Sequence, residues 1–182
     1  MKTIVNSTQK SILSFICLFV FQIIIAQTYN DNEDTESTEA STTVGGQQFS
    51  QTQFSSFFDT TPNPILENIQ SNSIAIEQAG SNNTIIARVA SRASEININQ
   101  NGLGNDVNLI YKVDAVVSNL SQNGNDNIIK DYVIDPNAKV SLDLQQTGNN
   151  LIFDKFGSNN ISKNIKFNQT EASPTIIIRS FN

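Results

Sequence analysis

Apolar and polar residues alternate in short runs that recur about every 22 residues from position 71 onward. Each run ends on a glutamine two positions after an apolar residue. In all but one run a second apolar residue lies two positions earlier, and Ser118 is the exception. A period of two indicates a β-strand with one buried face. The glutamines on that apolar face are Gln78, Gln100, Gln122, Gln146 and Gln169.

A glycine follows each of the first four glutamines by two positions, and a short polar stretch then leads to an asparagine and a second apolar run. Glycine and asparagine tolerate the positive φ that a sharp reversal needs. The residues assigned to these arcs are Gly80, Asn83, Gly102, Asn105, Gly124, Asn127, Gly148 and Asn150. We therefore predict an all-β protein, in which about five strand–arc–strand repeats over residues 65–182 stack into a β-solenoid.

The buried glutamines predict the register of that stack. A buried amide without a partner costs about 1–3 kcal/mol, so five isolated glutamines in a core would be costly. If the repeats stack in register, each side-chain amide can donate to the identical residue of the next repeat, about 4.8 Å away. The sequence therefore predicts a hydrogen-bonded glutamine ladder inside the solenoid.

Charges interrupt the apolar pattern in the return strands of the third and fourth repeats. Strict alternation places either Lys130 or Asp131, and either Asp154 or Lys155, on the inner face. We expect a local bulge there, or a charge that turns outward near the end of the strand.

The repeats resemble curlin repeats, the units of curli amyloid fibres, whose pattern is Ser-x5-Gln-x-Gly-x-x-Asn-x-Ala-x3-Gln. The second repeat matches it at Ser94, Gln100, Gly102 and Asn105, and the resemblance covers residues 71–182. The second glutamine of the pattern is missing, and its places are taken by Val89, Tyr111 and Val133. The resemblance implies a stacked cross-β fold, and the missing glutamines argue against a role as the major fibre subunit.

The N-terminus has the pattern of a secretory signal peptide. Lys2 and Lys10 precede an apolar stretch at 12–25, which ends at Ala26 and Gln27. A membrane-spanning helix needs about 20 apolar residues, more than this stretch offers. We predict a signal peptide over 1–26, a secreted or cell-surface protein, and a mature chain that lacks the one cysteine, Cys17.

Residues 27–64 are predicted to be a disordered leader. Their charged residues are all acidic: Asp31, Glu33, Asp34, Glu36, Glu39 and Asp59. From position 44 the composition changes to Gln, Ser and Phe, with Phe49, Phe54, Phe57 and Phe58 in a polar background. The curlin resemblance implies that such a segment is recognised by an outer-membrane export channel. The alternative is that the phenylalanines cover the exposed first repeat.

The residue inventory gives little support to catalysis or ligand chemistry. The chain has no histidine, and the carboxylates that follow two arcs, Asp106 and Asp126, fit solvated turns. Clustered lysine and arginine, which nucleic-acid binding requires, are absent from the sequence pattern. Residues 101–106 match a calcium-binding glycine-rich repeat only once, although that motif must recur. We expect no enzyme activity, cofactor, metal ion, nucleic acid or small-molecule substrate.

Two function classes remain. One is a structural subunit of an extracellular curli-type amyloid fibre, minor or nucleating, with itself or a related curlin subunit and the export machinery as partners. The other is a monomeric β-solenoid that acts as a surface adhesin or binding module. The β-branched run at Ile176, Ile177 and Ile178 has no sequence after it that would cover a final strand, so we expect it to be a polymerisation edge.

Overall fold

The computed structural model describes residues 41–181, which are mostly β-strand. The strands are β1 (Ser41–Val44), β2 (Gln47–Phe49), β3 (Asn72–Ser81), β4 (Ser91–Leu103), β5 (Asp106–Asn123), β6 (Ile128–Thr147), β7 (Ile152–Phe153), β8 (Asn164–Thr170), β9 (Thr175–Ile176) and β10 (Ile178–Phe181); the helices are α2 (Gln51–Phe57) and the 3-10 helix η1 (Pro64–Glu67). The predicted signal peptide at 1–26 and residues 27–40 of the predicted leader lie outside the described residues.

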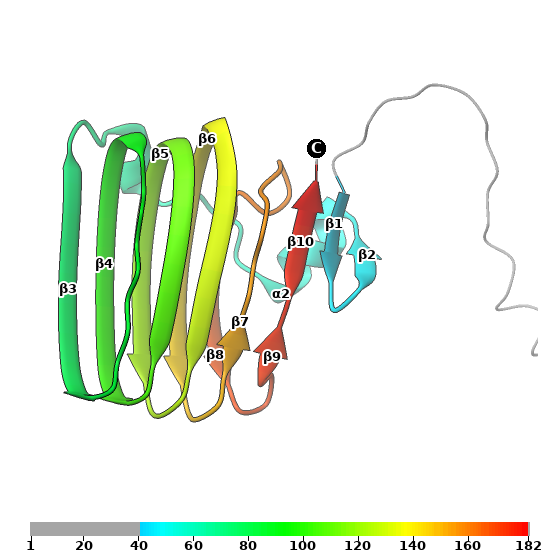
Figure 1. Cartoon of the computed structure of the whole chain (residues 1–182). Coiled ribbons are helices and arrows are strands. Elements are labelled where there is room, and N and C mark those ends of the chain that lie inside the picture. Colours follow the sequence, from blue (N-terminus) through cyan, green and yellow to red (C-terminus); the bar gives the residue numbers. More distant parts are fainter. Residues whose placement is uncertain (1–40, 182) are drawn as a thin grey trace, which may run out of the picture. The chain divides into compact units, whose positions relative to one another are not determined.

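Five segments that carry the glutamines pair in parallel and form the first wall of a β-solenoid (Figure 1). The segments are β3, β4, the second halves of β5 and β6, and β8, and each belongs to one turn, or rung, of the stack. The register sets identical positions opposite one another, so that Gln78 pairs with Gln100, and Gln122 with Gln146. The structure therefore confirms the predicted β-solenoid of about five stacked turns.

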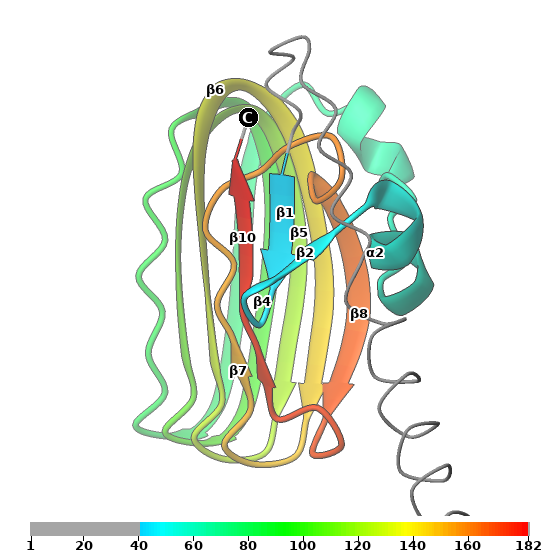
Figure 2. The same ribbon diagram turned by 90° about the vertical axis from the view of Figure 1, so that its right-hand side faces the viewer.

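The second wall contains the return strands. It consists of the first halves of β5 and β6 followed by β7 and β9, again in parallel. β5 and β6 each continue round the corner of the solenoid without a break, which Figure 2 shows as bent ribbons. A return strand of one repeat is therefore joined directly to the glutamine strand of the next.

One irregularity in β6 explains the longest of the repeat steps, from Gln122 to Gln146. Val113 pairs with Asp135, but Ala115 pairs with Lys139, so β6 carries two extra residues at this corner. Pro136, which has no backbone N–H for a ladder bond, lies in this insertion. The insertion lengthens the step from Gln122 to Gln146 relative to the two preceding steps.

The core lies between the two walls. Ile96, Ile98 and Leu120 of the first wall pack in one cluster with Val107 and Leu109 of the second wall, and all five are buried. Alternation along each strand explains this cluster, because every second side chain points into the space between the walls.

Residues 59–71 connect the two ends of the stack along its outer surface. Asp59 pairs with Lys166 of the last rung, and Leu66 packs against Ala115 and Val117 of the third. Further on, the backbone N–H of Ser94 donates to the carbonyl of Ser71, which leads into β3. The chain before β3 thus begins at the last rung and crosses the stack to reach the first.

Residues 41–59 fold over the last rung, and we call them the cap. β1 pairs antiparallel with β10 and with β2, and α2 follows (Figure 2). The helix begins at Ser50 with a capping box, in which Ser50 and Gln53 bond to each other's backbone N–H groups. The prediction of a disordered leader over 27–64 is therefore wrong for residues 41–64, because local turn chemistry and phenylalanine burial order them.

Candidate functional site

The five glutamines form a continuous ladder of hydrogen bonds inside the stack. Each Nε2 donates to the Oε1 of the next rung: Gln78 to Gln100 at 2.6 Å, Gln100 to Gln122 and Gln122 to Gln146 at 2.8 Å, and Gln146 to Gln169 at 2.9 Å. The last four glutamines are fully buried. The ladder has a direction, because the donor always belongs to the earlier rung.

Each buried amide also donates to backbone carbonyls of the arc. Gln122 Nε2 lies 3.0 Å from the Asp106 carbonyl and 2.8 Å from that of Asn127. Gln169 Nε2 has no later glutamine and donates to the carbonyls of Ile152 and Ser173, both at 2.9 Å. The glutamines therefore fix the register of the stack and hold the arc against the first wall.

The arc glycines lie where no side chain fits. Gly80, Gly102 and Gly124 have positive φ of 108°, 131° and 131°, and a Cβ on any of them would collide with the carbonyl oxygen of the glycine in the next rung. On Gly148, a Cβ would meet the side chain of Glu171, which stands at the glycine position of the last rung. Glycine at this position is therefore required wherever another rung follows.

The arc asparagines form a second ladder. The side chain of Asn83 donates to the Gly102 carbonyl at 3.1 Å and accepts from the backbone N–H of Asn105 at 3.0 Å. Asn105 makes the equivalent bonds to the Gly124 carbonyl and to the N–H of Asn127. In the structure these two ladders bring together the predicted glutamine, glycine and asparagine positions of the first three rungs.

Asn150 differs from the other arc asparagines. The side chain of Asn127 accepts from the N–H of Leu151, so Leu151 occupies the ladder position of the fourth rung. Asn150 lies one position earlier, where its φ of 57° matches that of Asp126 at 55°. It provides the left-handed backbone of the turn, which asparagine tolerates, and does not extend the ladder.

The β3 end of the stack is open in the part of the chain that the structure describes. β3 pairs with β4 on one side only, and all ten of its residues are exposed. Ile74 and Ile76 are 48% and 49% exposed, although they pair with the buried core residues Ile96 and Ile98 of the next rung. None of the described residues donates to Gln78 Oε1, so the glutamine ladder ends here on a free acceptor.

The opposite end is closed, which corrects the predicted polymerisation edge. Ile176 and Ile178 are buried, Ile177 is partly buried, and its carbonyl accepts from the N–H of Gly45 in the cap. β10 pairs along its length with β1. Residues far earlier in the chain return to cover this strand, so the predicted edge is wrong.

The phenylalanines of the predicted leader also lie at this closed end. Phe54 and Phe58 are buried and stack on each other, and Phe58 lies 5.1 Å from the Phe167 ring, centroid to centroid. The alternative that these residues cover the first repeat is wrong, because they cover the last one. Their recognition by an export channel stays a prediction.

Two charges that we expected at a bulge or turned outward are instead buried as a pair. Lys155 Nζ lies 3.1 Å from Asp131 Oδ1, and their side chains are 3% and 1% exposed. Close by, the hydroxyls of Tyr111 and Ser118 share a hydrogen bond of 2.6 Å. Burial raises the pKa of Tyr111 well above its ordinary value, and the charge of Asp131 raises it further, so the hydroxyl stays protonated.

The hydrogen bond between Tyr111 and Ser118 explains two departures from the repeat. Ser118 breaks the apolar column because it binds the Tyr111 hydroxyl across the core. Tyr111 stands where the curlin pattern has its second glutamine. At this position a hydrogen bond across the core therefore takes the place of a glutamine bond to the next rung. The Tyr111–Ser118 bond was not predicted, because the sequence does not show which residues face each other across the core. Asp131 and Lys155 occupy equivalent positions of neighbouring rungs, as Ile128 and Ile152 do, and alternation alone did not show that both face inward.

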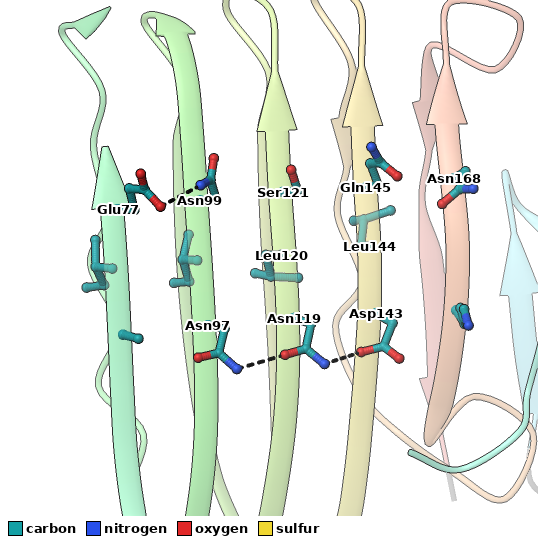
Figure 3. Close-up of a pocket in the computed structure, with 14 residues that line it drawn as sticks. Glu77, Asn97, Asn99, Asn119, Leu120, Ser121, Asp143, Leu144, Gln145 and Asn168 are labelled. Carbon is teal, nitrogen blue, oxygen red and sulfur yellow. Dashed lines mark hydrogen bonds between the residues drawn. The ribbon is translucent and has the colours of Figure 1, made fainter. Parts of the chain in front are cut away.

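The outer face of the first wall carries rows of polar side chains (Figure 3). Asn97 donates to Asn119 at 2.9 Å, Asn119 donates to Asp143 at 2.7 Å, and Asn99 donates to Glu77 at 3.0 Å. They line an open groove across five rungs with a volume of about 720 Å³. Within residues 41–181, no three His, Cys, Asp or Glu side chains gather as a metal ion would need, and no helix there is long and apolar enough to span a membrane.

Compared with models of known protein families, with curated proteins and with solved structures, the chain matches none. The resemblance to curlin repeats therefore rests on the residues of the repeats alone.

Proposed function

We propose that the chain is a structural subunit of an extracellular curli-type amyloid fibre, in a minor or nucleating position. The observation that carries the proposal is the open β3 edge at the end of an in-register ladder. A strand edge of ten residues with unpaired backbone groups is a template for pairing with another chain. The solenoid already has the parallel, in-register stacking of a cross-β fibre.

Addition of a rung at β3 is energetically favourable for three reasons. It would pair the free backbone groups of the strand and give Gln78 Oε1 a donor. It would also remove the half-exposed side chains of Ile74 and Ile76 from water, at about 25 cal/mol per Å² of apolar area. A β-solenoid that functions as a monomer would be expected to protect this edge.

The closed end favours a minor or nucleating position over that of the bulk subunit. A repeating fibre subunit needs two complementary free ends, and here the cap covers the last rung. Such a chain fits the end of a fibre, from which other subunits extend. The predicted signal peptide at 1–26 and the curlin resemblance support secretion through an export channel to the cell surface.

Assembly of the purified mature protein tests this proposal. We expect the protein to enter fibres with a meridional reflection near 4.8 Å when seeds of a curlin-like protein are present. The variant Ile76→Lys, which places a charge on the inner face of the open rung, should abolish assembly. Ala75→Lys is the matched control, because Ala75 is exposed on the other face of the same strand. A chain that remains a folded monomer with and without seeds would contradict the proposal.

The second candidate function is a monomeric surface adhesin or binding module. The outer groove favours it, because amide and carboxylate side chains from successive rungs line one continuous surface (Figure 3). Its rows of amides and carboxylates already bond to one another along the stack. A monomer in sedimentation that binds cells, and loses this binding on Asn119→Ala, would favour the adhesin.

A further inference from the structure

The open β3 end presents three polar atoms whose partners can be read from the rungs behind it. The first is Gln78 Oε1. At every later rung this atom accepts from the glutamine Nε2 of the preceding rung, at 2.6 to 2.9 Å. A chain that adds a rung in the same register must therefore bring a glutamine to this position.

The second atom is the carbonyl oxygen of Gly80. The equivalent carbonyls of Gly102 and Gly124 lie where a Cβ of the preceding rung would stand, and each accepts from the side chain of the preceding asparagine, Asn83 or Asn105. The residue that adds opposite Gly80 must therefore be glycine, two positions after the glutamine. An asparagine three positions further on would supply the donor.

The third atom is the backbone nitrogen of Asn83. The N–H groups of Asn105 and Asn127, at the same position of the next rungs, donate to the asparagine Oδ1 of the preceding rung at 3.0 and 3.1 Å. The same incoming asparagine would accept from Asn83. Together the three atoms specify Gln-x-Gly-x-x-Asn in the rung that docks.

The last rung of this chain does not meet that specification. It has Gln169, but Glu171 replaces the glycine and Pro174 replaces the asparagine. The N–H of Ser173 donates to the Thr170 carbonyl and closes a turn where the other rungs have their glycine arc. Asp59 of the cap also pairs with Lys166, so part of the outer edge of β8 is already occupied.

We infer that the β3 edge binds a different chain, whose exposed final rung carries Gln-x-Gly-x-x-Asn, and does not bind a second copy of this protein. The partner docks in parallel, with its glutamine amide donating to Gln78 Oε1. This inference rests on the proposed function and adds the identity of the neighbour to it. Because the other end is closed, the protein would occupy only one of the two ends of a fibre.

Peptide binding to the full mature chain tests the inference. The probe is a labelled peptide copied from residues 116–128, which contains Gln122, Gly124 and Asn127 in the required spacing. Its matched control carries Gly124→Glu and Asn127→Pro, the residues of the last rung. By fluorescence anisotropy, we expect the first peptide to bind at least about tenfold more tightly. Gln78→Leu in the protein should reduce that preferred binding by about tenfold.

Three results would overturn the inference. The first two are equal binding of both peptides and unchanged binding by the Gln78→Leu variant. The third is self-association of the mature chain through β3, as fibres or as pairs, and in that case the proposed fibre function would stand. Selective peptide binding by a chain that enters no fibre, even with curlin-like seeds, would support the inference and contradict the proposed function.

Discussion

At the ladder position, one amide serves the rungs on both sides of it. Gln146 accepts from Gln122 and donates to Gln169, and it also lies 2.9 Å from the Ile128 carbonyl. Such an amide is a structural requirement of the stack, because its removal leaves buried partners unsatisfied.

We predict that Gln146→Ala lowers the free energy of unfolding by about 1–3 kcal/mol, because Gln122 loses its acceptor and Gln169 its donor. The matched control is Gln145→Ala, since Gln145 is exposed on the outer face of the same strand. Denaturant unfolding measures both variants. Similar losses at the two positions would show that the ladder does not stabilise the fold.

The buried pair of Asp131 and Lys155 is predicted to be costly to break and inexpensive to replace. Lys155→Met should destabilise the fold by about 3–5 kcal/mol, because it leaves Asp131 buried without its counter-ion. The double variant Asp131→Leu with Lys155→Met should recover most of that loss. The comparison uses chemical denaturation, and a double variant no more stable than the single one would contradict this.

The ion pair between Arg92 and Asp114 should make the stability of the fold depend weakly on pH. The guanidinium of Arg92 donates to Asp114 at 2.8 and 2.9 Å and lowers the pKa of that carboxyl from its ordinary 3.8. A lowered pKa in the folded state gives stability that is present above pH 3.8 and is lost as the pH falls through the folded value. We expect a small loss on acidification that Asp114→Asn lacks, measured by thermal unfolding between pH 6 and 3.

Residue patterns predict the first wall well and the contacts across the core poorly. The glutamine and glycine positions could be found from sequence because each repeats at fixed spacing. The sequence shows Asn150 one residue early in its arc, but it does not show that Leu151 takes the ladder position instead. The Tyr111–Ser118 bond crosses the core, and no repeat pattern shows it. The Asp131–Lys155 pair follows the register of the second wall, but alternation left open which residue of each neighbouring pair faces inward.

Among the elements, the cap was not predicted, although its sequence carries local signals for a helix and a hairpin. Ser50 and Gln53 have the spacing of a capping box, and Gly45-Gly46 between short β-branched and polar runs fits a hairpin turn. These local signals were outweighed by a polar composition that is typical of disorder. Their docking site, the last rung, lies more than 100 residues away in the sequence, so only the fold reveals it.

The cap should depend on Phe54 far more than on Phe57. Phe54 is fully buried and Phe57 is 64% exposed, although both lie on α2. Phe54→Ala removes buried apolar contacts worth about 3–5 kcal/mol, so the cap should open locally. Hydrogen exchange at the β1 amides should accelerate in this variant and stay unchanged in Phe57→Ala; equal rates in both would contradict the role assigned to Phe54.

For the whole molecule, the two ends of the stack differ in kind. Among the described residues, one end is a strand without a second neighbour, whose ladder acceptor receives no hydrogen bond, and the other is covered by residues 41–59. The sequence predicted the stack and the existence of an exposed end but assigned that end to the wrong terminus of the repeat domain. Which end is exposed decides the direction in which subunits could be added.

The most direct test of this account is hydrogen exchange on the mature protein before and after it sediments with curlin-like seeds. We predict that those amides of β3 that do not bond to β4 exchange rapidly in the soluble protein and become protected in the sediment, while amides of β1 are protected in both. Protection of β3 that does not change, together with loss of protection in β1, would contradict the account and place assembly at the capped end.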